Sequence, residues 1–111
     1  DETQFIIESQ IQAFLDENAE LAYSYAAPLI KMKFNNPQEF MYMVKNYYEP
    51  VYNPKRFQFI DAKYFEGAIF HQLQVISQNN ESFLATYSLI QDEGKWKISG
   101  CAVYPMQKQS I

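Results

Sequence analysis

A stretch near the end of the chain, residues 83–104, constrains the fold more than any other. Apolar side chains take alternate positions in both of its halves: Phe83, Ala85, Tyr87 and Leu89, then Trp96, Ile98, Ala102 and Tyr104. Such alternation is typical of β-strands that have one face on a core. Between the halves lies Asp92-Glu93-Gly94, and Gly94 readily takes the positive φ that a tight hairpin turn needs. The stretch therefore predicts two long strands joined by a hairpin turn.

Two more strands are predicted just before this hairpin. From Arg56 onward the side chains alternate with a period of two, over residues 57–65 and again over residues 68–78. Glu66-Gly67 separates these two segments, and the polar residues 78–81 lead into the hairpin as a second turn. The second half of the chain is therefore predicted to be a four-stranded antiparallel meander.

The first half of the chain shows helical spacing instead. Residues 3–17 are predicted to form an amphipathic helix with one buried stripe of Ile7, Ile11, Phe14 and Leu15. A second helix over residues 19–26 is expected to begin at Asn18 and to end before Pro28. Its inner face would carry Leu21, Ala22, Tyr25 and Ala26. Residues 29–34 are expected to form a short helical turn or an irregular connector.

A third helix has the clearest start signal in the chain. Asn36 supplies a capping side chain, Pro37 suits the first helical position, and Glu39 stands where a capping box needs it. Phe40, Met43, Val44 and Tyr47 then recur at helical spacing. Pro50 is predicted to end this helix, which leaves residues 51–53 as an extended or turn-like link.

These elements predict one α+β domain over residues 1–111. Three N-terminal helices would pack on one face of a curved four-stranded antiparallel sheet, because the helices and the strands are segregated along the chain. The chain has 111 residues, 48% of them hydrophobic and 17% aromatic, which is enough apolar surface for one core.

Composition argues against several classes of function. The net charge is −4 and the nine basic residues are scattered, so we expect no nucleic-acid partner. No apolar run approaches the ~20 residues of a membrane span. One cysteine and one histidine lack metal-ligand spacing, and three unclustered glycines form no phosphate-binding loop, so neither metal nor cofactor is expected.

Several motifs together resemble a known family. They are Phe40-x-x-Met43-Val44, Tyr48-x-Pro50-Val51-Tyr52-x-Pro54, Tyr87-x-Leu89 and the turn Gly94-Lys95-Trp96-Lys97-Ile98. The order of the elements, the long first helix and the final hairpin with Gly94-Lys95-Trp96-Lys97-Ile98-Ser99-Gly100 resemble the nuclear-transport-factor-2-like, or cystatin-like, superfamily. Within that superfamily the motifs most resemble an uncharacterised bacterial domain family of unknown function.

The resemblance implies a cone in which the curved sheet wraps around the helices. The superfamily includes ketosteroid-isomerase-like and dehydratase-like enzymes, ligand-binding modules and dimerisation domains, so the fold does not select a function. The resemblance implies no known catalytic residues for this chain. Members of the family often follow a secretory signal, which together with the start at Asp1 implies the periplasm or the cell exterior; the cytoplasm is the alternative.

Aromatic residues and the single histidine suggest where a pocket would lie. The candidate pocket residues are His71, Tyr25, Phe40, Tyr47, Tyr87 and Trp96. His71 lies on the apolar side of its strand, where it would be either a general base in the pocket or a hydrogen-bonded core residue. Asp61 would be either a carboxylate on the concave face or an edge charge that opposes aggregation.

The outer face of the hairpin is a candidate homodimer surface. It would carry Leu84, Thr86, Ser88, Ser99, Cys101 and Val103. We favour a non-enzymatic protein that binds a small apolar ligand or a protein partner, because an aromatic-rich concave face occurs without a catalytic motif. The alternatives are an isomerase- or dehydratase-like enzyme that uses His71, and a structural dimerisation module.

Overall fold

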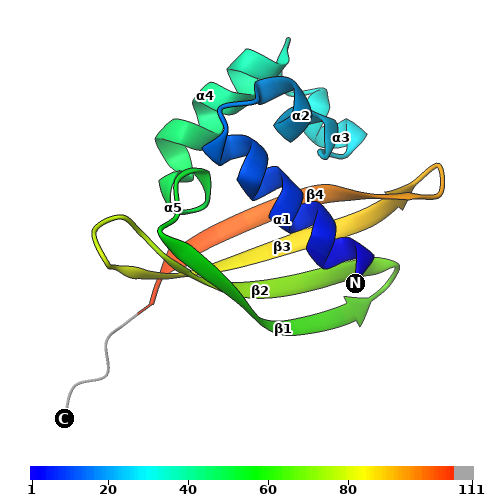
Figure 1. The fold of residues 1–111 in the computed structure, drawn as a ribbon. Helices are drawn as coiled ribbons and strands as arrows, with labels where there is room; N and C mark the ends of the chain where they lie inside the picture. Colours follow the sequence, from blue (N-terminus) through cyan, green and yellow to red (C-terminus); the bar gives the residue numbers. More distant parts are fainter. Residues whose placement is uncertain (107–111) are drawn as a thin grey trace.

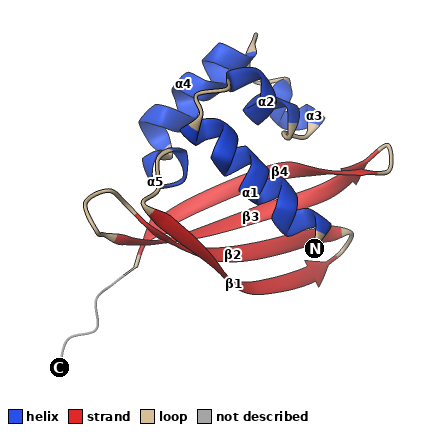
Figure 2. Cartoon of the chain, in the orientation of Figure 1, coloured by secondary structure: helices blue, strands red, loops and turns tan. Residues whose placement is uncertain are grey.

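The second half of the chain forms a four-stranded antiparallel sheet in the order β1-β2-β3-β4, as predicted. The computed structural model describes residues 1–106, and all of its helices lie on one face of the sheet (Figures 1 and 2). The strands are β1 (Arg56–Phe65), β2 (Ala68–Ile76), β3 (Ser82–Asp92) and β4 (Lys95–Pro105). Gly67 and Gly94 take φ angles of 83° and 80° in the two tight turns, which glycine adopts without strain. The α+β class is confirmed.

Two β-bulges shift the faces of the sheet. Ser88 of β3 pairs with Gly100 of β4, and the next residue, Leu89, pairs with Ile98. Ser99 is therefore an extra residue in β4. An extra residue in one strand moves the following side chains to the opposite face. Cys101 and Val103 therefore pair with Tyr87 and Ala85 and pack against the core. Their assignment to the outer face is wrong, while Leu84, Thr86 and Ser88 do lie on it.

The other bulge lies in β1, between Phe59 and Asp61. Phe59 pairs with the buried Leu73, whereas Asp61 pairs with Gln72 on the outer face. Asp61 is exposed, so the interpretation of this residue as a carboxylate on the concave face is wrong.

Helix α1 (Glu2–Leu15) crosses the inner face of the sheet (Figure 1). The Asp1 side chain caps its start by accepting a hydrogen bond from the backbone nitrogen of Gln4. Ile7, Ile11 and Phe14 are buried as predicted. Leu15 is 40% exposed, because Ala13 rather than Leu15 completes the buried stripe at the end of the helix.

Within residues 1–106 four further helices follow α1, where the sequence predicts two helices and, over residues 29–34, a short helical turn or an irregular connector. They are α2 (Ala19–Ser24), α3 (Pro28–Lys31), α4 (Pro37–Tyr47) and α5 (Glu49–Tyr52). As expected, α2 and α4 end before Pro28 and Pro50, but each proline then stands in the first turn of a new helix. A proline fits there because the first helical nitrogens have no partner within the helix. Residues 51 and 52 are therefore helical rather than extended.

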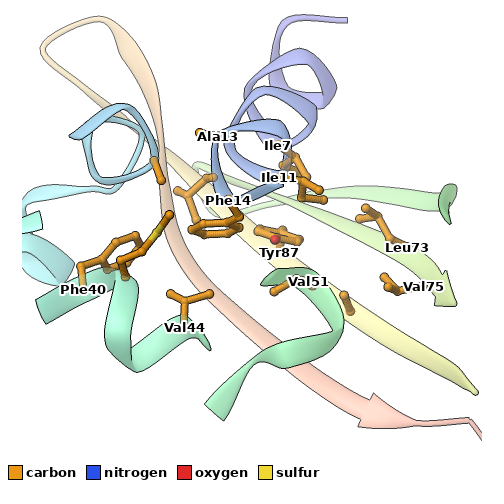
Figure 3. Packing of buried hydrophobic residues seen from close by; sticks show 14 of the residues in the cluster. Ile7, Ile11, Ala13, Phe14, Phe40, Val44, Val51, Leu73, Val75 and Tyr87 are labelled. Atoms are coloured by element: carbon orange, nitrogen blue, oxygen red, sulfur yellow. The ribbon is translucent and has the colours of Figure 1, made fainter. Parts of the chain in front are cut away.

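The core forms between the inner face of the sheet and the helices. Ile7, Ile11 and Phe14 of α1 pack with the inner-face residues Leu73 and Tyr87 (Figure 3). Leu21, which was predicted to belong to this core, is 42% exposed. Residues 107–111 of the predicted domain lie outside the described part of the chain.

Candidate functional site

A pocket of about 270 Å³ lies between the helices and the last two strands. Helices α1, α3, α4 and α5 form its walls, together with β3, β4 and the segments next to α3. Its lining residues are Gln10, Phe14, Ala26, Ile30, Lys33, Phe34, Phe40, Met43, Val44, Tyr48, Val51, Tyr87, Ile98, Ser99, Gly100 and Cys101. We call this the helix–sheet pocket.

The wall of the helix–sheet pocket is mainly apolar. Phe14, Phe40, Val44 and Val51 project from three helices on the side of the sheet where Tyr87 lies (Figure 3). Among the described residues, Lys33 is the only charged one in the lining, and its side chain is exposed. An apolar pocket with a few polar groups is the usual form of a small-molecule site.

The Tyr87 hydroxyl is the most informative polar group of the pocket. Tyr87 is 1% exposed, and among the described residues its oxygen has no hydrogen-bond partner. Leaving a buried hydroxyl unpaired costs about 1–3 kcal/mol, so such groups are rare in folded proteins. Burial raises the pKa of Tyr87 well above its usual value of 10.0, with smaller contributions from Cys101, so the hydroxyl keeps its proton.

Cys101 lies next to Tyr87 as its partner on the neighbouring strand. Burial raises the pKa of the Cys101 thiol from 9.0 to about 12, against a smaller opposing effect of the Tyr87 hydroxyl. The two groups are thus close enough to affect each other's pKa. Among residues 1–106, no partner meets the geometry of a hydrogen bond to the Tyr87 oxygen. Two neutral groups, each with a proton to donate, therefore stand side by side in the pocket wall.

The bulge in β4 shapes the part of the wall beside these two groups. The Ser99 and Ser88 hydroxyls lie 2.9 Å apart and share a hydrogen bond. The backbone of Ile98 bonds to Tyr25 and Ala27, at 2.8 and 2.7 Å, so the segment after α2 runs along β4 as an extra short bridge. The bulge brings Cys101 to the inner face. The bridge fixes β4 against the segment that follows α2.

The structure brings only part of the predicted pocket together. Phe40 and Tyr87 line the helix–sheet pocket. Tyr25 and Trp96 are half-buried against the core but are not in the lining. Tyr47 is 77% exposed and points away from the core, because α4 buries Phe40, Met41 and Val44 instead.

His71 lies under the start of α1, outside the lining of the helix–sheet pocket. It is 1% exposed, and its Nε2 lies 2.7 Å from Thr3 Oγ1. The Thr3 hydroxyl donates its one proton to Asp1 Oδ1, at 2.7 Å, so Nε2 is the donor to Thr3. This assignment leaves Nδ1 as a buried acceptor, which has no partner among the described residues.

Burial also lowers the pKa of His71 from 6.5, so we predict a pH-dependent stability. The unfolded chain takes up a proton near pH 6.5, whereas the folded protein does so only at lower pH. Stability is therefore full above pH 6.5 and decreases as the pH falls toward the folded pKa, by at most about 1.4 kcal/mol per pH unit. Urea unfolding between pH 7.5 and 5.5 measures this loss. The loss should be absent in His71→Gln, and equal pH profiles of the two proteins would contradict it.

Sequence reasoning missed several pocket residues, of which Gln10 was within reach. Gln10 is 3% exposed and stands three residues after Ile7, on the buried stripe of α1. Its Nε2 donates to the carbonyl oxygen of Ala22 at 3.2 Å. Val51 was missed because Pro50 was taken to end helical structure, and Cys101 because the bulge has no clear signal in the sequence.

Neither a metal-binding cluster nor a membrane-spanning helix is found within residues 1–106. No cluster of three or more His, Cys, Asp or Glu side chains there has an arrangement that could hold a metal ion. Over the same residues, no helix has both the length and the apolar character needed to cross a membrane.

The chain belongs to a family described as Domain of unknown function (DUF4864), whose model matches residues 1–111. This match confirms the resemblance to an uncharacterised domain family. No curated protein matches the sequence.

Proposed function

We propose that this domain binds a small, largely apolar ligand in the helix–sheet pocket. The observation that carries the proposal is the Tyr87 hydroxyl, which is buried in the wall of the pocket without a partner among the described residues. A ligand that reaches this hydroxyl would satisfy it while the surrounding apolar side chains cover the rest of the ligand.

The volume of the pocket suggests the size of the ligand. An engineered apolar cavity of about 150 Å³ in another protein holds benzene. The helix–sheet pocket has about 270 Å³. By proportion it has room for roughly ten non-hydrogen atoms.

Filling the pocket from α4 should prevent binding. Val44 is 5% exposed and lines the pocket, so Val44→Phe places additional side-chain volume in the space that a ligand would occupy. We expect isopropylbenzene to bind the natural protein. Its affinity for the variant should be at least about tenfold lower, because the new phenyl ring takes up the space in which the ligand makes its apolar contacts. Isothermal titration calorimetry measures the affinity, and circular dichroism checks that the variant is folded.

Tyr47→Ala is the matched control on the same helix. Tyr47 is 77% exposed and was one of the residues predicted to line a pocket. Its removal should leave the affinity for isopropylbenzene within about twofold, because its side chain does not contribute to the lining. Loss of binding in Tyr47→Ala together with full binding in Val44→Phe would contradict the proposed location.

The enzymatic alternative has less support than ligand binding. It requires His71 in the pocket, yet this side chain is bonded to Thr3 beneath α1 and does not line the pocket. Three expectations stay predictions of the sequence. They are the cone of the nuclear-transport-factor-2-like superfamily, a homodimer through the outer face of the sheet, and export from the cytoplasm.

A further inference from the structure

We infer that the ligand of the helix–sheet pocket carries an uncharged oxygen acceptor, such as a carbonyl oxygen, which it presents to Tyr87 and Cys101. This inference rests on the proposed function and adds the chemical class of the ligand. It follows from two polar groups that stand together in the wall, Tyr87 and Cys101, and from the position of Lys33, the one charged lining residue in the part of the chain that the structure describes.

Tyr87 and Cys101 favour an acceptor as their partner. Burial raises the pKa of both groups, so each keeps its proton at neutral pH. A phenol hydroxyl donates a hydrogen bond readily, and a thiol adds a weaker donor beside it. Because the Tyr87 oxygen has no hydrogen-bond partner among residues 1–106, a ligand oxygen can take a hydrogen bond from Tyr87 and contact the neighbouring Cys101 thiol.

The distribution of charge disfavours an ionised group at this end of the pocket. Burying a carboxylate is costly unless a cation lies beside it. Within residues 1–106, Lys33 is the only cation in the lining, and it is exposed to solvent, whereas Tyr87 is 1% exposed. An anionic ligand would therefore lose its hydration next to Tyr87 without gaining a buried ion pair.

A pure hydrocarbon is also a poorer fit than a molecule with one acceptor. It would cover the apolar wall but leave the Tyr87 hydroxyl unpaired and shielded from water. A carbonyl oxygen in the same place relieves that penalty at little cost in shape.

Three probes of the same shape and the same number of non-hydrogen atoms test this class: acetophenone, isopropylbenzene and benzoate. We expect Tyr87→Phe to lower the affinity for acetophenone about tenfold, because one hydrogen bond to a buried group is lost. The same variant should change the affinity for isopropylbenzene by less than about twofold, since the ring and its apolar contacts remain. In the natural protein, benzoate should bind weakest of the three. Calorimetric titration measures all three affinities.

The outcomes separate the acceptor class of the ligand from the proposed function. If isopropylbenzene and acetophenone both bind and Tyr87→Phe lowers the two affinities equally, the ligand needs no oxygen acceptor. The inference is then overturned while the proposed function stands. Benzoate binding more tightly than acetophenone to the natural protein would also overturn it, whether or not the variant folds. If none of the three binds the natural protein, the proposed function itself fails.

Discussion

Phe14→Ala is expected to lower the free energy of unfolding by about 3–5 kcal/mol. Phe14 is 2% exposed at the meeting point of α1, α4 and α5. Its ring centroid lies 6.2 Å from that of Phe40 and 5.9 Å from that of Tyr52. Removing the ring loses these contacts and enlarges a pocket that the side chain already lines, so the neighbouring side chains cannot close the gap. Small domains have only about 5–15 kcal/mol in total, so the loss should be evident in urea unfolding.

Leu15→Ala is the control for this prediction. Leu15 is the next residue on the same helix and is 40% exposed, so its truncation should cost less than about 1 kcal/mol. Both substitutions leave alanine in the last turn of α1, and helix propensity therefore changes little between them. A larger cost for Leu15→Ala than for Phe14→Ala would mean that α1 faces the sheet in a different rotation.

The Cys101 thiol is expected to react at least about 50-fold more slowly in the folded protein than in the unfolded chain at pH 8. Burial raises its pKa from 9.0 to about 12, which lowers the thiolate population about 1000-fold. A more basic thiolate is intrinsically more nucleophilic, which returns about 20-fold of that factor in reactions with disulfides. The half-buried position of the residue slows access further. The rate of reaction with an aromatic disulfide reagent, followed by absorbance, measures the difference.

The same protein in concentrated urea supplies the reference rate, because the thiol is then exposed with its ordinary pKa. If Cys101 lay on the outer face of the sheet, as the strand pattern without the bulge suggests, its folded and unfolded rates would be similar. Equal rates would therefore contradict both the raised pKa and the position of Cys101 in the pocket wall.

Much of the fold could be predicted from the sequence because its signals are local. The alternation of Phe83, Ala85, Tyr87 and Leu89, with a glycine at the turn, predicts the hairpin, and the structure contains it. The capping residues Asn18 and Asn36 begin α2 and α4 as expected, each by accepting a backbone hydrogen bond. These features depend on neighbours in the sequence rather than on the packing of distant segments.

The candidate site was harder to predict because two of its determinants are not local. The extra residue Ser99 moves Cys101 from the outer to the inner face, and only the pairing with β3 shows this. Tyr47 has helical spacing with Phe40 and Val44, yet α4 packs through Phe40, Met41 and Val44 and leaves Tyr47 exposed. His71 was placed correctly on the apolar face of its strand, but α1 covers it through Thr3 instead of leaving it in a pocket.

Nuclear Overhauser contacts to a bound probe test whether the helix–sheet pocket holds a ligand. With methyl-labelled protein and acetophenone, we expect contacts from the probe to the methyl groups of Ile30, Val44 and Ile98, which converge on the pocket from α3, α4 and β4. Contacts that are found only to Leu84 and Ile90, on the outer face of the sheet, would contradict the claim.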